Sequence, residues 1–371
     1  MKRKSYFQLS DGVRLSVAGL LYVMTEVLKR VFKANAGTLF PKYRELSKAW
    51  MKIKADVVSV VPFALWDIFF FLGIIAAVFL FVWIMIKNRK ALIWWVTTML
   101  LVVSALYFYG SAVWSYNHYG PSLAQEMGFS KDQFTEDELY RAAFYYTKMA
   151  ALYAEEVERD ETGAIRKEAY PLKQAAKDAG QAFVSLGETY PVFSGGSVKP
   201  VKRLTVFDPI MLYTGTSGIF VEFTGEATVP SGNDVVDVPH TMCHEAAHRL
   251  GIASEEDANF AAFLACDASD DPYFKYSGYY SAFIYTINKL NEISPGKVQT
   301  VYKNCQGEGL SLVFADSGHA VETYKKYDTP VEKAGQKIND ASLKSYDVEE
   351  GVRSYGNVVN DLIAWYLLQE K

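Results

Sequence analysis

The sequence predicts a mainly α-helical protein in two parts, a membrane anchor over residues 1–120 and a soluble domain over residues 121–371. Two apolar runs near the N-terminus carry almost no charge, and each is long enough to cross a bilayer as a helix. Beyond residue 120 charged residues are common, and apolar residues recur at helical spacing. Alternating apolar and polar residues between Val198 and Val229 predict a small region of β-structure or extended chain.

The bulk composition argues against two classes of protein. A formal net charge of −4 is untypical of nucleic-acid-binding proteins, which normally carry a basic surplus. The three cysteines (Cys243, Cys266 and Cys305) form no CxxC pair and no regular spacing, so a disulfide scaffold is not expected. We therefore expect no nucleic acid among the partners, whereas the apolar runs predict a lipid bilayer.

The two strong candidates for transmembrane helices cover about residues 62–86 and 91–110. Asp67 is the one charged residue in the first run, and the second run has none. A short basic turn over residues 87–90 separates them, so we predict a helical hairpin in the membrane rather than a buried core pair. Aromatic residues near the ends of the second run are typical of a membrane interface. These are Trp94, Trp95, Tyr107, Tyr109 and Trp114.

A weaker candidate for a membrane helix covers about residues 13–31. Arg14 and Glu26 bracket an uncharged stretch that is too short to span the hydrocarbon core. Three interpretations are open: a degenerate first span, an uncleaved signal-like anchor, or an amphipathic helix on the membrane surface.

The distribution of Lys and Arg gives two opposed predictions of orientation. The positive-inside rule places the turn over residues 87–90 in the cytoplasm, and the soluble domain then lies outside. The basic stretch before the first strong run favours the opposite orientation. Its cations are Lys33, Lys42, Arg44, Lys48, Lys52 and Lys54. We favour a multi-pass protein of the cell membrane with an extracytoplasmic soluble domain.

The soluble domain begins with clear helix signals. Thr135 to Glu138 form a capping box that opens a helix running towards Arg159. A second helix is expected from Tyr170 to Leu186, ended by Gly187. Helices resume near Val238 and continue to a last helix that ends near Leu368, after a loop over residues 346–356.

The run His244-Glu245-Ala246-Ala247-His248 carries the chemistry. On a helix, positions i and i+4 share a face, so His244 and His248 can bind one metal ion. Two neutral imidazoles leave a tetrahedral zinc ion two positions short, and catalytic sites add one protein ligand and one water. Glu245 lies next to the open position, where a general base for the water is needed.

The third ligand is expected just after the turn that follows His248. Gly251 is well placed to end the first helix, and Ser254 is a good N-cap for the next. Glu255 then occupies the first position of a helix that folds back across the first one. Asn259, one turn further on, can hydrogen-bond a ligand imidazole. We therefore assign the metal ligands as His244, His248 and Glu255.

Zinc in such a site lowers the pKa of its water towards about 7, and Glu245 shuttles the proton, which is peptide or amide hydrolysis chemistry. The competing interpretation is a chance match on an ordinary amphipathic helix. His240 is interpreted as a neighbour of the site rather than a ligand, and His118 and His319 as surface or interface residues. Arg353 and Tyr355 either stabilise an oxyanion or belong to a loop that caps the last helix.

Several runs together make the chain similar to a known family. They are residues 114–117 with Pro121, 213–215, 223–227, 244–252, 255–264 and 351–356. The chain resembles a bacterial family of membrane-anchored proteins, domain-of-unknown-function family 3810, which is grouped with the gluzincin-like zinc metallopeptidases. The resemblance covers nearly the whole length and implies a zincin-like, mostly helical metallopeptidase domain. The acidic run also resembles the Glu-x-x-Ala-Asp/Asn ligand turn of other membrane zinc peptidases, which again favours Glu255.

The function expected is that of a membrane-anchored zinc metallopeptidase acting on a peptide or protein substrate, with Glu245 as the general base. Two alternatives remain. One is a non-catalytic membrane sensor or scaffold that keeps the zinc-binding fold, and the other is an amidase that acts on cell-wall peptides. The sequence does not discriminate among their substrates.

Overall fold

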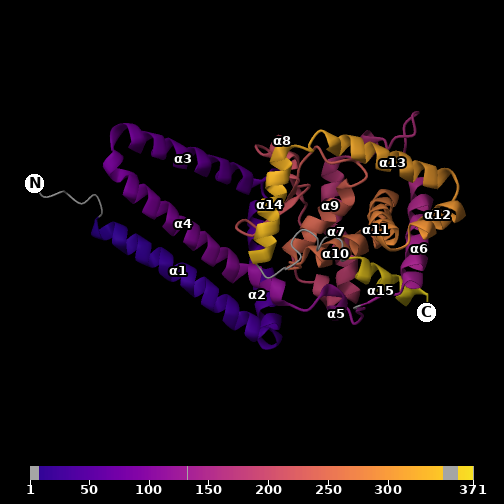
Figure 1. Ribbon diagram of the computed structural model, residues 1–371, viewed down its shortest axis with the longest axis horizontal. Helices are drawn as coiled ribbons and strands as arrows, with labels where there is room; N and C mark the ends of the chain where they lie inside the picture. The colour runs from indigo at the N-terminus through magenta and orange to yellow at the C-terminus, as the bar shows by residue number, and fades with distance from the viewer. Residues whose placement is uncertain (1–7, 132, 346–357, 371) are drawn as a thin grey trace, which may run out of the picture.

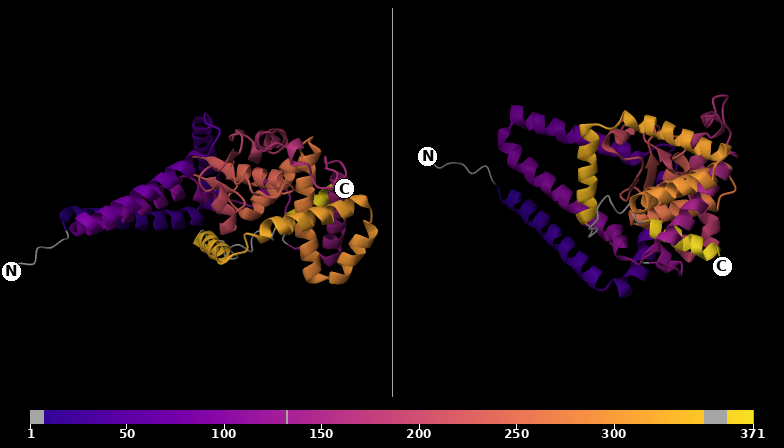
Figure 2. Two further views of the ribbon diagram at one scale, coloured as in Figure 1. Left: turned by 90° about the horizontal axis from the view of Figure 1, so that it is seen from above. Right: turned by 45° about the vertical axis from the view of Figure 1, so that its right-hand side comes forward.

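The computed structural model describes residues 8–131, 133–345 and 358–370, and it is mainly helical, as the sequence predicts. Three long helices project from one side of a larger helical body (Figure 1). They are α1 (Leu9–Ala34), α3 (Leu65–Lys87) and α4 (Leu92–Val113). Figure 2 shows the same division from two further directions.

Helices α3 and α4 form the predicted hairpin, joined by the short 3₁₀ helix η1 (Arg89–Ala91). Both are long and apolar enough to span a membrane, and only 6% of the most apolar window of each is buried. The core helix of a soluble protein would be mostly buried, so α3 and α4 are not core helices. In the described part of the chain they are the two helices that meet this criterion.

Helix α1 extends over the whole of the weaker candidate and packs along α4. Arg14 Nε donates to Thr97 Oγ1 at 3.0 Å, and the Tyr107 hydroxyl donates to Glu26 at 2.7 Å. The two contacts show that α1 and α4 run parallel. The charges that interrupt the apolar run therefore face α4, while many apolar side chains are exposed. These include Val13, Val17, Leu20, Val27 and Val31.

The basic stretch after α1 is also helical, although its composition and Pro41 did not indicate this. Helix α2 (Ala36–Val58) connects the end of α1 with the start of α3, and it runs across the direction of the projecting helices (Figures 1 and 2). One of its faces is buried against the rest of the chain. The residues of this face are Phe40, Ser47, Lys48, Met51 and Ala55.

The start of α3 is fixed to the body by two carboxylates. Asp67, which is fully buried, accepts the backbone N–H groups of residues 205–207. In return, Glu226 accepts the N–H groups of Leu65 and Trp66, both at 2.9 Å, and so satisfies donors at the helix N-terminus. The one charge in the first apolar run is therefore a hydrogen-bond partner of the body.

The body is built from nine longer helices and two short ones in the described residues. The longer ones are α6 (Glu136–Ala154), α7 (Leu172–Thr189), α9 (Val238–Arg249), α10 (Glu255–Asp267), α11 (Pro272–Ile293), α12 (Pro295–Asn304), α13 (Glu308–Lys325), α14 (Pro330–Ser345) and α15 (Val359–Gln369). The short ones are α5 (Leu123–Glu126) and α8 (Asp208–Met211).

The predicted helix boundaries are partly right. The Thr135–Glu138 capping box is present, with the Glu138 N–H donating to Thr135 Oγ1 at 3.2 Å. The prediction that Gly187 ends the next helix is wrong, because Gly187 lies inside α7. A Cβ atom there would approach the Ser194 backbone to 3.3 Å, so the glycine allows the chain after α7 to fold back closely. The predicted loop over residues 346–356 lies outside the described residues.

The expected extended region forms a small three-stranded sheet in the order β1-β3-β2. Strand β1 (Lys202–Arg203) is parallel to β3 (Glu226–Val229), and β2 (Ile219–Val221) is antiparallel to it. Gly225, with φ of +71°, makes the turn between β2 and β3. The sheet packs on α9 through β3 and β2.

Helix α9 lies at the centre of the body, and each of its residues is buried. It packs against α7, α10, α11 and β3. The surrounding core is rich in fully buried aromatic side chains, which hold the helix rigidly. These include Tyr146, Phe260, Phe263, Phe274 and Tyr276. The fold therefore buries the helix that carries the two-histidine motif.

Candidate metal centre

Two helices and one turn place the predicted ligands. His244 and His248 lie one turn apart on α9, which ends at Arg249. Gly251, with φ of +82°, turns the chain, and the Ser254 side chain caps α10 by accepting from the Asp257 N–H. Glu255 is the first residue of α10, as the spacing predicts.

The donor atoms of these residues converge. His244 Nε2 lies 3.1 Å from His248 Nε2, and Glu255 Oε2 lies 3.0 Å from the first and 3.6 Å from the second. Ligand atoms placed about 2.0–2.1 Å from a tetrahedral zinc ion are about 3.3 Å apart. The three distances therefore match the edges of a zinc coordination tetrahedron.

Hydrogen bonds at Nδ1 orient each imidazole so that its Nε2 atom faces the centre of the cluster. His248 Nδ1 lies 2.8 Å from the Ile252 carbonyl oxygen, which can only accept, so Nδ1 carries the proton. His244 Nδ1 makes the same contact, at 2.8 Å, with Asn259 Oδ1, as predicted for Asn259. Both Nε2 atoms then face each other and the Glu255 carboxylate. Burial lowers the pKa of His248, but Glu255 outweighs this and raises that pKa to about 9, so the cluster favours a cation, either a proton or a metal ion.

The carboxyl groups of the site differ in their environment. Burial raises the pKa of Glu255, but His248 and His244 outweigh this and hold that pKa well below its usual range. Burial raises the pKa of Glu245 to about 7, although the same two imidazoles oppose the shift. Glu255 is therefore an anion suited to a cation, and Glu245 is close to the proton affinity that general acid–base catalysis requires.

Glu245 lies between α9 and the edge of the sheet. Its carboxylate is 4% exposed, and its Oε2 atom has no hydrogen-bond partner among the described residues. A Cβ atom on Gly218, the residue before β2, would lie 2.5 Å from Glu245 Oε1. The absence of a side chain at Gly218 therefore gives the carboxylate its place beside the strand.

Comparison with known proteins assigns the chain to a family. A family model described as a protein of unknown function, DUF3810, matches residues 43–363. The chain belongs to the DUF3810 family. The match begins within α2 and includes both apolar helices of the hairpin and each residue of the cluster. No curated protein and no solved structure shows significant similarity to the chain.

The end of the second apolar helix reaches the cluster of His244, His248 and Glu255 in this DUF3810 protein. Trp114, at the C-cap of α4, donates its indole N–H to the backbone carbonyl of His248 at 3.2 Å. Its ring also packs edge-on against the His248 ring, with centroids 6.0 Å apart, and against Phe220 of β2. One side chain thus joins the hairpin, the ligand helix and the edge strand.

His118 is a neighbour of the site that the sequence did not reveal. It lies in the short 3₁₀ helix η2 (Ser115–Tyr119), with its ring 5.6 Å from the Trp114 ring. Burial, and then the nearby His248, lower its pKa to about 4, so the imidazole is neutral. The only available signal was its place one turn after Trp114 at the end of the hairpin.

The other candidates keep secondary roles. His240 is buried one turn before His244, and burial lowers its pKa to about 3. Among the described residues the converging group of ligand atoms comprises His244, His248 and Glu255, so His240 is a neighbour as expected. Cys243 and Cys266 are buried with their sulfur atoms 4.0 Å apart. Arg353 and Tyr355 lie outside the described residues, and their roles stay predictions.

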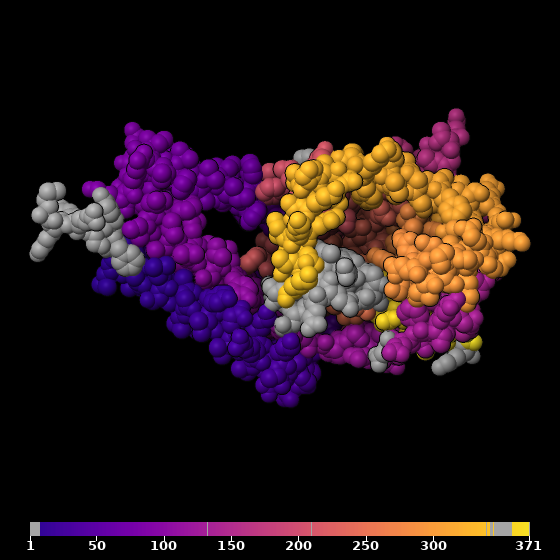
Figure 3. All heavy atoms as spheres, viewed as in Figure 1, coloured from indigo at the N-terminus to yellow at the C-terminus, as the bar shows by residue number. Residues whose placement is uncertain are grey.

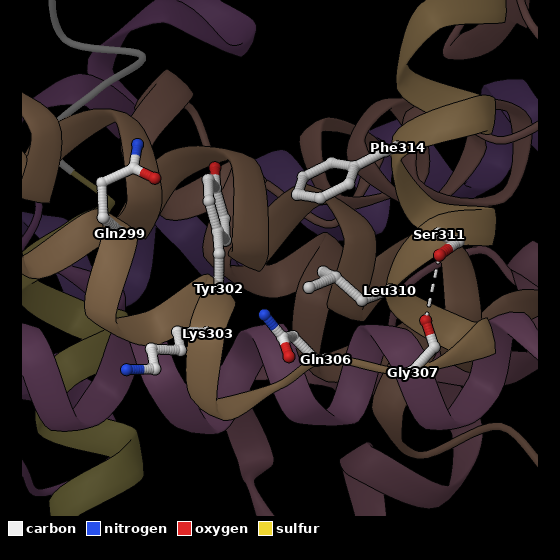
Figure 4. A pocket seen from close by; sticks show the side chains of 8 residues that line it. All are labelled: Gln299, Tyr302, Lys303, Gln306, Gly307, Leu310, Ser311 and Phe314. Atoms are coloured by element: carbon white, nitrogen blue, oxygen red, sulfur yellow. Dashed lines mark hydrogen bonds between the residues drawn. The ribbon is translucent and has the colours of Figure 1, made fainter.

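A separate surface groove lies between α12 and α13. It has a volume of about 550 Å³ and is lined by Tyr302 and Phe314, whose rings meet edge-on, and by amide and lysine side chains (Figure 4). None of its lining residues is a carboxylate, histidine or cysteine, so the groove lacks the residue types of the His244, His248 and Glu255 cluster. The space-filling view shows a different recess on this face, bordered by α13 and α14 (Figure 3).

Proposed function

We propose that this protein is a membrane-anchored, zinc-dependent metallopeptidase with a zincin-like body. The observation that carries the proposal is the convergence of three donor atoms from His244, His248 and Glu255, with the buried Glu245 carboxylate beside them. Two neutral imidazoles and one carboxylate are a donor set that zinc prefers in hydrolases. When bound, zinc would supply a Lewis acid that polarises a carbonyl and makes water a nucleophile at neutral pH.

The residues around the cluster have different roles in the proposed reaction. Asn259 and Ile252 orient the two imidazoles by accepting their Nδ1 protons. The buried Glu245 carboxylate beside the donor atoms takes a proton from the attacking water and returns it to the leaving amine, the role of a general base and then a general acid. Trp114 packs edge-on against the His248 ring, and Phe220 packs on Trp114 and supports it there.

A peptide is the substrate that the adjacent strand would favour. Strand β2 is at the edge of the sheet, and its outer side pairs with no other strand of the described chain. An extended peptide can add to such an edge through backbone hydrogen bonds. Because Gly218 precedes β2 and touches Glu245, a peptide added there would pass close to the general base.

The decisive test combines metal analysis with one substitution. The purified full chain is expected to hold one zinc per molecule and to cleave a randomised peptide pool. Glu245→Gln should keep the zinc and lose about 100-fold or more in rate, the usual contribution of a general base. His248→Ala should lose the zinc. Absence of zinc would overturn the proposal, and a fully active Glu245→Gln would remove Glu245 from the mechanism.

The same variant tests the rival function. A sensor or scaffold that uses zinc only for its fold would bind the metal, cleave no pool and be unaffected in cells by Glu245→Gln. The place of the buried Glu245 carboxylate, beside the three donor atoms and next to the edge strand β2, favours catalysis, because a site that only stabilises the fold needs no carboxylate there.

We further propose that α1, α3 and α4 cross the membrane with the body outside. Helix α1 begins beside the α3–α4 turn (Figures 1 and 2), so Arg14 and the basic residues 87–90 lie at the same end of the projection. The positive-inside rule places that end in the cytoplasm. Two reporters fused after Lys371 test this orientation. A reporter that folds only outside the cytoplasm should be active, and a reporter that folds only in the cytoplasm should be inactive.

The cations of α2, which favoured the opposite orientation, have other partners. Lys48 donates to the backbone carbonyls of Val192 and Ser194, at 2.7 and 3.0 Å. Lys54 donates to the Glu222 carbonyl and Arg44 pairs with Glu126. Side chains bound to the body in this way serve the fold, so their number is a poor guide to the side of the membrane.

A further inference from the structure

Helix α2 has an apolar stripe that nothing in the described chain covers. Five large apolar side chains on it are between 40% and 66% exposed. They are Leu39, Leu46, Trp50, Ile53 and Val57. Their spacing of seven, four, three and four residues places them on one face of the helix. Such a stripe is unfavourable in water and requires an apolar partner.

The opposite face of α2 is bound to the body. Lys48 and Met51 are buried there, and the Lys48 ammonium is held by two backbone carbonyls. The turn before β3 also rests on α2, because a Cβ atom on Gly225 would lie 2.9 Å from the Met51 carbonyl oxygen. Helix α2 therefore separates the body from whatever covers the stripe.

The place of α2 identifies the partner. The helix crosses the ends of the three projecting helices that lie next to the body (Figures 1 and 2). Along their length these three helices expose many apolar side chains. Trp50 of the stripe donates to the Tyr109 hydroxyl near the end of α4 at 2.9 Å. An amphipathic helix at this level, with a Trp among its apolar residues, is typical of the boundary between lipid headgroups and acyl chains.

The cluster of His244, His248 and Glu255 lies close to α2, on the side of the body. Trp114 ties the end of α4 to His248, and Asp67 with Glu226 fixes the start of α3 to the sheet. Helix α2 itself contacts α9. One α-helix with its side chains is about 10 Å thick, so the cluster lies roughly one helix thickness from the apolar stripe.

We propose that α2 lies in the headgroup region of the bilayer and that the metal centre above it cleaves polypeptide next to the membrane surface. The substrate class is then the juxtamembrane segment of a membrane-anchored protein. The second half of this proposal rests on the proposed hydrolytic function, whereas the first half does not.

The position of α2 can be tested without any activity. In the full chain with Cys305→Ser, a polar maleimide is applied to Ile53→Cys and to Val321→Cys in vesicles of phosphatidylethanolamine and phosphatidylglycerol. The two remaining cysteines are fully buried, and Val321 on α13 is an exposed apolar position of the body. Labelling at residue 53 should be about tenfold slower or more, because lipid excludes the reagent. Equal labelling rates would overturn the proposal.

The substrate class is tested with one randomised peptide pool in three forms. The pool is free, or lipid-anchored through Gly/Ser spacers of about 3 or about 20 residues, with spans of about 10 and 25 Å. A site at the surface should cleave the short-spacer pool about tenfold faster than the long-spacer pool, because effective concentration falls with spacer length. A site far from the lipid would reverse this order, since the short spacer could not reach it.

A matched pair of variants separates the two proposals. Ile53→Glu with Val57→Glu should lower cleavage of the short-spacer pool and leave that of the free pool unchanged. The control is Ile293→Glu with Val321→Glu, two exposed apolar positions of the body, which should change neither. Cleavage of the free pool as fast as the short-spacer pool would overturn the juxtamembrane substrate and leave the metallopeptidase intact. Cleavage of no pool would overturn both.

Discussion

The projecting helices and the body bury opposite kinds of residue. In α1 and α4 the buried positions include Asp11, Thr25 and Thr97, while many leucine and valine side chains are exposed, and α3 also exposes phenylalanine. In the body the buried positions around α9 are aromatic and aliphatic, as Phe260 and Phe274 illustrate. This inversion is expected if hydrocarbon surrounds the projection and water surrounds the body, because burial of apolar surface is favourable only against water.

The largest difference between the regions should appear on truncation of phenylalanine. Phe260→Ala removes a fully buried ring from the core and should lower the free energy of unfolding by about 3–5 kcal/mol. Phe79→Ala removes a ring from α3 that is 70% exposed, and in detergent micelles it should have little effect. Thermal unfolding of both variants in micelles provides the comparison. A comparable loss for Phe79→Ala would mean that this face of α3 packs on protein.

The sign of the change in the free energy of unfolding on substitution of Asp67 tells whether its carboxylate lies in hydrocarbon or binds the body. Asp67→Ala should lower the free energy of unfolding by about 1.5–3 kcal/mol, because the N–H groups of residues 205–207 lose a charged acceptor. A carboxylate buried in hydrocarbon would give the opposite sign, and the variant would be more stable. Thr98→Ala is the control in the same unfolding assay, because Thr98 is only half-buried and its hydroxyl donates within its own helix, to the Trp94 carbonyl at 2.7 Å.

The buried ammonium of Lys48 predicts a dependence of stability on pH. Burial lowers the pKa of Lys48 to about 8, below its usual value in the unfolded chain. The unfolded state therefore binds more protons above pH 8, so stability should rise between about pH 8 and 10 by about 1–2 kcal/mol. Lys48→Met should remove this part of the slope, which a series of denaturant titrations would measure. An unchanged slope would place the ammonium in contact with water.

The smallest effect is expected where α1 meets α4. Tyr107→Phe removes the hydroxyl that donates to Glu26 and should cost about 0.5–1.5 kcal/mol, the usual size of such a bond between membrane helices. Tyr22→Phe is a matched control, because Tyr22 stacks on Tyr107 and its hydroxyl is not needed for stacking. If both variants are neutral, the parallel packing of α1 on α4 depends on apolar contacts alone.

The convergence of His244, His248 and Glu255 could be predicted from the sequence because it is local. His244 and His248 are linked by helical periodicity, and the turn at Gly251 with the cap at Ser254 brings Glu255 back within a few residues. Asn259 follows from the same periodicity. Each of these inferences depends on short-range geometry, which the chain encodes in neighbouring residues.

The parts that the sequence did not reveal depend on residues far apart in the chain. Asp67 binds residues more than a hundred positions away, and Trp114 finds His248 at a similar separation. His118 packs on Trp114, but the contact of Trp114 with His248 is long-range, so the place of His118 beside the site could not be inferred. Helix α2 was not predicted because its lysines, of which Lys48 is buried, resemble those of a solvated basic linker.

The double attachment of α3 to the sheet has a kinetic consequence. Since Glu226 holds the start of α3 while Asp67 holds the chain before α8, the sheet and the ligand helix cannot turn freely about the anchor. If the anchor spans the bilayer and the cluster acts on an anchored substrate as proposed, the protein and its substrate meet by lateral diffusion, each with a fixed face towards the lipid. The rate of encounter then depends on the number of substrate molecules per unit area of membrane, and it is insensitive to the volume of the surrounding compartment.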